Sequence, residues 1–179
     1  MAESAIPLGW ENNPSSWPQR LPIVGLAVVG AAVAGYLASF QLGLVDTVWE
    51  PFFGGDSRLI LTSGVSRVLP IPDAGLGMIA YVADAVTALI GRHDRWRSMP
   101  WIVVLFGLAV GPLGATSILL VILQPVMFDA WCTLCLASAV ISLAMIGPAA
   151  DEVLASLQHL RRVHDRGGSV WRAFWLGAR

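Results

Sequence analysis

Long uncharged runs separated by short polar segments dominate the chain. Three runs, 23–45, 101–123 and 130–146, contain no charged side chain, and a fourth, 74–91, contains one, Asp84. A helix rises 1.5 Å per residue, so about 20 apolar residues cross a hydrocarbon core of about 30 Å. The pattern therefore predicts an all-α integral membrane protein, a bundle of four transmembrane helices.

Polar segments indicate how the four spans are connected. Segment 46–73 is interrupted by Gly and Pro and forms a long loop between the first two spans. The connector 92–97 is short and charged, and only 124–129 separates the last two spans, which must form an antiparallel hairpin. We expect an N-terminal segment, 1–20, a membrane domain, 21–148, and a polar tail, 149–179. The first 20 residues do not follow the pattern of a signal peptide, so we expect the first span to be a retained anchor.

The tail carries an amphipathic pattern. Its apolar residues recur at helical spacing: Val153, Leu154, Leu157, Leu160 and Val163. The last residues, SVWRAFWLGAR, repeat this pattern. Such a stripe suits a helix that lies in the membrane interface or docks on a partner, and we favour an interfacial C-terminal helix.

Arginine placement predicts the orientation, because short cytoplasmic loops carry an excess of positive charge. Arginines cluster between the second and third spans and after the fourth: Arg92, Arg95, Arg97, Arg161, Arg162 and Arg166. We therefore expect both termini in the cytoplasm, the 46–73 loop on the extracytoplasmic side, and a location in the cytoplasmic membrane.

Composition supports the membrane assignment. Hydrophobic residues make up 56% of the chain, charged residues only 13%, and the mean hydropathy is +0.68. These values are too apolar for a soluble domain of this length and predict contact with membrane lipid. The net charge of -1 and the lack of a basic stripe argue against nucleic acid as a partner.

The two cysteines form a single motif, Cys132-Thr-Leu-Cys135, at the extracytoplasmic start of the fourth span. A spacing of three places both sulfurs on one helix face, and the positive end of the helix dipole stabilises a thiolate. The alternative is a pair of packed cysteines or an inert bridge. A metal site is not expected, since the histidines lie on the predicted cytoplasmic side: His93, His159 and His164.

Two stretches carry a family resemblance, ILTSGVSRVLPIPDAGLGMIAYV and FDAWCTLCLASAVIS. Together they resemble the vitamin K epoxide reductase family of membrane thiol/quinone oxidoreductases, over roughly residues 20–148. The resemblance implies four helices around a quinone, either menaquinone or ubiquinone. It also implies that Cys135 faces the quinone and that Cys132 exchanges with thiols of a thioredoxin-like partner.

The same resemblance suggests further site residues. Asp73 falls where family members place a polar side chain that hydrogen-bonds a quinone oxygen, and Tyr81 falls on an aromatic position of the family. Ser63 and Ser66 match serines of the family loop. For the two serines, turn capping by the hydroxyl group is the slightly favoured alternative to a direct catalytic role.

The loop departs from the family pattern. Family members usually carry two further loop cysteines that relay electrons to the Cys-x-x-Cys, and this chain has neither, with Ser57 at the second position. Either electrons reach Cys132 directly from a partner thiol, or the protein is a non-catalytic membrane scaffold or accessory subunit. A transporter is disfavoured because the chain lacks internal repeats.

Two acidic residues need an explanation. Asp84 lies eleven residues beyond Asp73, about 16 Å deeper along a helix, where an ionised carboxylate is costly. We expect it to be protonated or partnered: as a proton relay toward the quinone, or hydrogen-bonded to a neighbouring helix through Thr116 or Ser117. Asp129, three residues before Cys132, is expected to cap the fourth span.

Overall fold

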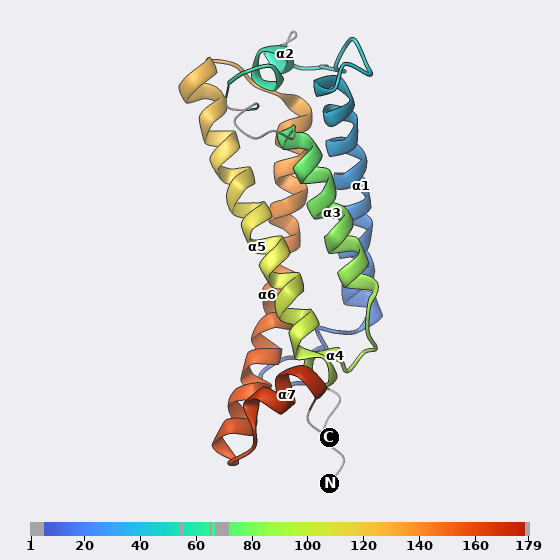
Figure 1. Ribbon diagram of the computed structural model, residues 1–179, viewed down its shortest axis with the longest axis vertical. Helices are drawn as coiled ribbons and strands as arrows, with labels where there is room; N and C mark the ends of the chain where they lie inside the picture. Colours follow the sequence, from blue (N-terminus) through green and yellow to red (C-terminus); the bar gives the residue numbers. More distant parts are fainter. Residues whose placement is uncertain (1–5, 54–55, 65, 67–71, 178–179) are drawn as a thin grey trace.

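The computed structural model describes residues 6–53, 56–64, 66 and 72–177, and the regular structure within them is entirely helical. Figure 1 shows the arrangement of the helices, which follow one another in this order: α1 (Trp17–Gln41), α2 (Asp56–Leu61), α3 (Asp73–Leu89), α4 (Arg95–Ser98), α5 (Pro100–Leu123), the π-helix η2 (Gln124–Phe128), α6 (Thr133–Asp165) and α7 (Val170–Leu176).

The long helices run side by side (Figure 1). α1 packs against α3 and α6, and α5 packs against α6 and α3. Three helices are long and apolar enough to cross a membrane: α1, α5 with η2, and α6. The prediction of an all-helical membrane protein is therefore confirmed, while α3, at 17 residues, is shorter than these three.

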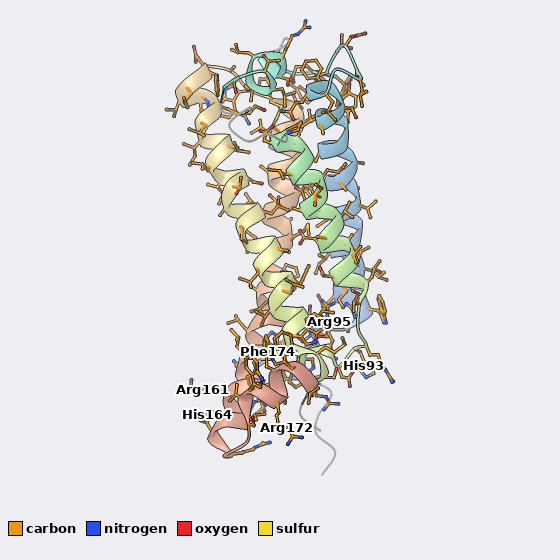
Figure 2. The ribbon with its side chains drawn as sticks, in the orientation of Figure 1. His93, Arg95, Arg161, His164, Arg172 and Phe174 are labelled. Carbon is orange, nitrogen blue, oxygen red and sulfur yellow. A yellow bond between two sulfur atoms is a disulfide. The ribbon has the colours of Figure 1, made fainter. Side chains whose placement is uncertain are left out.

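The molecule has two distinct ends. One end carries α2 and the Cys132–Cys135 pair and is called the cysteine end. The other carries α4, α7 and most of the arginines and is called the arginine end. Figure 2 shows Arg95, Arg161 and Arg172 gathered there. The N-terminal segment also lies at the arginine end, where the Asn13 side chain donates to the His93 carbonyl at 2.7 Å.

The core between the long helices is built from small and medium-sized apolar side chains: Ile23, Ala27, Ala34, Tyr81, Ala88, Phe106, Val110, Met145 and Ala149. Glycines in α5 allow close contact with α6. A Cβ at Gly107 would overlap Val153, and one at Gly114 would meet Ile146 at 2.5 Å. Outward-facing positions such as Val28, Leu108 and Val140 are exposed and apolar, as a lipid-facing surface requires.

The start and end of α6 differ from the sequence-based expectation. Its N-cap is Cys132, whose Sγ accepts a hydrogen bond from the Cys135 amide at 3.2 Å. The prediction that Asp129 caps this helix is wrong, because Asp129 has a left-handed backbone (φ 46°) at the end of η2. α6 also continues through Pro148 to Asp165, over the predicted boundary between the membrane domain and the tail.

A buried polar cluster closes the arginine end. Arg20 donates to the Ala88 carbonyl at 2.7 Å, and to further carbonyls just beyond the end of α3. Arg95 donates to the same turn and forms an ion pair with Glu152, which also accepts from Ser15. The two guanidinium groups satisfy the last carbonyls of α3 and complement the negative end of its dipole.

Candidate functional site

A disulfide joins Cys132 and Cys135 at the N-terminus of α6. Cys132 is completely buried, whereas Cys135 is half-buried. The backbone amide of Cys132 donates to Gln124 Oε1 at 2.9 Å, which ties the motif to η2. The two sulfurs therefore have different surroundings, and Cys135, but not Cys132, is among the described residues that line an internal cavity.

That internal cavity is an apolar space of about 450 Å³ beneath α2, enclosed by α1, α3, α5 and α6. Cys135 forms part of its wall, together with Asp73 and Tyr81. Most of the remaining wall is aliphatic and comes from residues such as Leu37 and Leu113. An apolar cavity of this size with a few convergent polar groups is typical of a small-molecule site.

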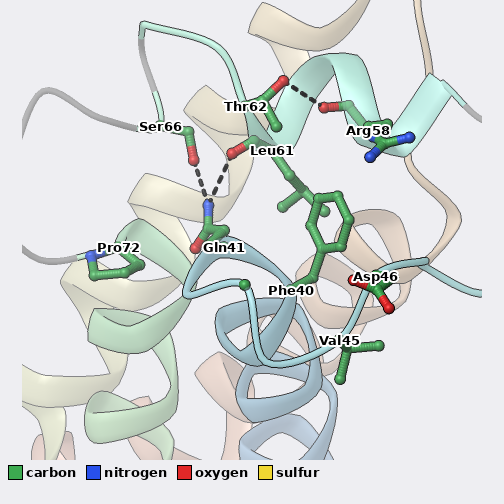
Figure 3. Close-up of a pocket in the computed structure, with 10 residues that line it drawn as sticks. Phe40, Gln41, Val45, Asp46, Arg58, Leu61, Thr62, Ser66 and Pro72 are labelled. Carbon is green, nitrogen blue, oxygen red and sulfur yellow. Dashed lines mark hydrogen bonds between the residues drawn. The ribbon is translucent and has the colours of Figure 1, made fainter.

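Asp73 begins α3 and is the acceptor at the centre of a hydrogen-bond network. Its Oδ1 accepts from Ser66 Oγ at 2.6 Å, from Gln41 Nε2 at 2.5 Å and from the Ala74 amide at 2.9 Å. Figure 3 shows Gln41 between Ser66 and Leu61, to whose carbonyl it also donates. The network attaches the loop to the first turn of α3 and holds the Asp73 carboxyl group at the cavity.

Tyr81 is buried two turns further along α3. Its hydroxyl donates to the Ser138 carbonyl at 2.6 Å and lies 3.0 Å from Ser138 Oγ. Ser138 follows Cys135 by three residues and also lines the cavity. The ring packs against Gly30, where a Cβ would lie only 2.6 Å from the ring. The aromatic side chain is thus held between α1 and α6, below Cys135.

The two loop serines have different roles in the structure. Ser63 Oγ accepts from the Ser66 amide at 3.3 Å, which is the turn-capping contact that the sequence favoured. Ser63 is not among the described residues that line the cavity. Ser66, by contrast, is buried and donates directly to Asp73. The structure therefore brings Ser66, Asp73, Tyr81 and Cys135 together and leaves Ser63 outside this group.

Asp84 is completely buried in α3. Within the part of the chain that the structure describes, neither of its carboxyl oxygens has a hydrogen-bond partner. The alternative of a hydrogen bond to Thr116 or Ser117 is therefore wrong, and Ser117 instead donates to the Leu113 carbonyl and accepts from Ser142. These contacts follow from α5–α6 packing, which periodicity alone does not define. A relay role for Asp84 stays a prediction.

A carboxylate bridge holds the outer loop on the cysteine motif. Glu50 accepts from Ser57 Oγ in α2 and from both the hydroxyl and the amide of Thr133, the residue after Cys132. Beside it, the Phe53 ring lies 6.3 Å from the Trp131 ring, centroid to centroid. The loop is therefore attached to the residues on both sides of Cys132, which explains how this cysteine is buried.

Four polar residues of the site were not found from the sequence: Gln41, Glu50, Gln124 and Ser138. Gln41, Glu50 and Gln124 come from parts of the chain distant from their partners, so no local pattern marks them. Ser138 could have been found, since it lies one turn after Cys135 on the same helix face.

Metal ligands do not gather at this site. Among the described residues no group of three or more His, Cys, Asp or Glu side chains could hold a metal ion. Figure 2 shows His93 and His164 at the arginine end, whereas Cys132 and Cys135 lie at the N-terminus of α6, at the cysteine end.

Comparison with known proteins agrees with this geometry. A sequence model described as the vitamin K epoxide reductase family matches residues 21–149, which include most of α1, all of α3 and α5, about half of α6 and both cysteines. No curated protein and no solved structure matches the chain. Because the family match covers well over half of the sequence, the chain belongs to the vitamin K epoxide reductase family.

Proposed function

We propose that the protein is a membrane thiol/quinone oxidoreductase. In the first half-reaction the Cys132 and Cys135 thiols form their disulfide and give two electrons and two protons to a quinone, which becomes a quinol. In the second, two thiols of a partner protein reduce the disulfide and become a disulfide themselves. The net reaction oxidises partner thiols and reduces quinone, and it needs no further reactant.

The position of Cys135 carries the proposal. It is the cysteine that forms part of the wall of an apolar cavity large enough for a small ligand. A quinone ring dissolves in the bilayer and suits such a cavity. Asp73 and Tyr81 line the same cavity, so the Asp73 carboxyl group is available to hydrogen-bond a quinone oxygen while the Tyr81 ring contacts the quinone.

Exchange with the partner is proposed to occur at Cys132, the sulfur outside the cavity wall. Because Cys132 is completely buried, an incoming thiolate reaches it only after the loop contacts at Glu50 and Phe53 open. Attack then forms a mixed disulfide with the partner and releases the Cys135 thiolate, which takes up a proton to become the thiol at the quinone cavity. With Ser57 in the loop instead of a cysteine, a thioredoxin-like or other thiol protein donates electrons directly to Cys132.

The proposal includes an orientation in the cytoplasmic membrane. We place α3 in the bilayer as the fourth span, because it packs between α1 and α5. The arginine end faces the cytoplasm by the positive-inside rule, and the cysteine end faces outward. The aromatic cluster of α7 with Trp101 suits the lipid interface, since the rings of Trp101 and Trp175 lie 6.1 Å apart and Trp171 is largely exposed.

Turnover of the purified protein tests the function. The full chain, reduced with dithiothreitol, is given menadione or a short-chain ubiquinone, and quinol formation is followed by absorbance. We expect Cys135→Ala to abolish catalysed turnover, and activity that persists in this variant would eliminate the thiol mechanism. In cells, Cys135→Ser leaves Cys132 able to hold a mixed disulfide, and mass spectrometry of that adduct identifies the donor.

A second function is favoured by one observation. The disulfide is closed and Cys132 is shielded from solvent, as expected for a static bridge in a non-catalytic scaffold or accessory subunit. In that case dithiothreitol-reduced protein does not transfer electrons to either quinone, and no mixed disulfide is trapped.

A further inference from the structure

A second, polar pocket lies beside the apolar cavity at the cysteine end. It has a volume of about 370 Å³, and its lining includes Asp46, Arg58, Thr62 and Ser66 (Figure 3). The first three of these side chains are exposed, so water reaches the pocket from the cysteine end. The apolar cavity, by contrast, is surrounded mainly by aliphatic side chains.

One short hydrogen bond connects the polar pocket to the apolar cavity. Ser66 lines the polar pocket, Asp73 lines the apolar cavity, and Ser66 Oγ donates to Asp73 Oδ1 at 2.6 Å. A serine hydroxyl has one donor and two acceptor lone pairs. The donor is directed to Asp73 and one lone pair accepts from Gln41, so one lone pair is available to a water molecule in the polar pocket.

Gln41 positions the side chains of Ser66 and Asp73 relative to each other. Its side-chain amide donates to both Ser66 and Asp73, and its Oε1 accepts from the Ala74 amide at 3.3 Å. Gln41 lies at the last turn of α1, whereas Asp73 begins α3, so the amide also fixes the distance between these helix ends.

We propose that Ser66 and Asp73 form a proton path from water in the polar pocket to a quinone oxygen in the apolar cavity, with Gln41 as a positioning residue. This inference rests on the proposed function. Reduction of the quinone needs a proton at each of its two oxygens. The Cys135 thiol proton passes to one oxygen within the cavity, and Asp73 gives its proton to the other.

The proton balance then closes through water. Asp73 regains its proton from Ser66, which takes one from water in the polar pocket. Cys132 releases its thiol proton to water as its sulfur bonds to Cys135. Per turnover, two thiol protons are lost, two protons appear on the quinol, and two electrons move from sulfur to the quinone. The path supplies a proton to a cavity whose aliphatic wall otherwise keeps water away.

Steady-state kinetics of the full-length protein with dithiothreitol and menadione test the path. We expect Ser66→Ala to lower kcat about 100-fold and to leave KM nearly unchanged, because a positioned proton-transfer step contributes about 10²-fold to 10⁴-fold. The solvent deuterium isotope effect on kcat should rise, since proton delivery becomes limiting. Ser66→Thr retains the hydroxyl and should restore both values. Thr62→Val is the matched control, because its hydroxyl lines the same pocket but donates to the Arg58 carbonyl.

A quinone-free measurement separates this inference from the proposed function. Reduction of the Cys132–Cys135 disulfide by dithiothreitol should be equally fast in Ser66→Ala and wild type. The path is overturned if Ser66→Ala keeps wild-type kcat and isotope effect, if Ser66→Thr gives no rescue, or if Thr62→Val loses as much. If Ser66→Ala does not fold, Gln41→Met replaces it, with the same expected direction. If Cys135→Ala is as active as wild type, the proposed function itself fails and the path with it.

Discussion

The two ends of the molecule both bury polar groups, but they use them differently. At the arginine end, Arg95 and Glu152 form a buried ion pair, Arg20 completes the end of α3, and the polar groups fill the space between the helices. At the cysteine end, Asp73 and Cys135 border a cavity. Polar groups that satisfy one another hold helices together, whereas polar groups that face a cavity remain available to a ligand.

The difference also concerns the surrounding chain. The arginine end is closed by ordered contacts from the N-terminal segment, α4 and α6. The cysteine end is covered by a loop that is attached to α6 through Glu50 and Phe53. We therefore expect substitutions at the arginine end to change stability, and substitutions at the cysteine end to change access and turnover.

The strongest test of the comparison is the side of the membrane that each end faces. In a Cys132→Ser, Cys135→Ser background, single exposed cysteines are placed as Thr62→Cys at the cysteine end and Asp165→Cys at the arginine end. A membrane-impermeant maleimide should label only Thr62→Cys in intact cells, and both after permeabilisation. Labelling of Asp165→Cys alone in intact cells would show that the arginine end faces outward. The basis for an extracytoplasmic thiol partner would then be lost.

The largest stability effect is expected from Glu152→Ala. It leaves Arg95 buried without its ionic partner, which costs about 3–5 kcal/mol of unfolding free energy. Thermal unfolding in detergent measures the loss, with the exposed neighbour Asp151→Ala as the matched control. Turnover per folded molecule should be unchanged. If Glu152→Ala is as stable as Asp151→Ala, the ion pair does not hold this end together.

A smaller loss of stability is expected at Gly30, where α1 packs against the Tyr81 side chain of the cavity wall. A Cβ at Gly30 would lie 2.6 Å from the Tyr81 ring, so Gly30→Ala must displace the ring or α1. Overpacking of this kind costs about 1–3 kcal/mol. The KM for menadione should rise as well, because Tyr81 lines the cavity. Gly25→Ala is the control, since nothing lies within 4 Å of its Cβ position. Equal stability and KM in both variants would contradict this account of the Gly30–Tyr81 contact.

The smallest effect concerns the loop over Cys132. Glu50→Ala removes the hydrogen bonds that Glu50 accepts from Ser57 and Thr133, each with a net value of about 1 kcal/mol. The population of the open state should therefore rise about 30-fold. Alkylation of the reduced protein by N-ethylmaleimide should accelerate at Cys132, as read by mass spectrometry. Asp46→Asn, an exposed change in the same loop, should alkylate at the wild-type rate. Unchanged alkylation of Glu50→Ala would show that this bridge does not control access.

Some features of the fold and of the site could be predicted from the sequence, and others could not. The apolar runs predicted α3 and α5 within two residues and located α1 and the start of α6, because a bilayer requires about 20 apolar residues whatever the packing. They did not predict that α6 continues to Asp165, because its last turns lie in the polar tail. The Cys-x-x-Cys spacing predicted that the two sulfurs lie together, because its geometry is local to one helix turn, and the structure joins them in a disulfide. The cap of α6 was missed, since Asp129 ends a π-helix that periodicity does not reveal.

The sequence by itself determined the membrane helices, the cysteine pair and the family. Only the tertiary structure decided that Asp84 is buried without a hydrogen bond from Thr116 or Ser117, and that Ser66 and Gln41 meet Asp73. The physical reason is distance along the chain. Hydrophobic periodicity and motif spacing act over a few helix turns, whereas Gln41 and Asp73 are 32 residues apart and meet only when α1 packs against α3.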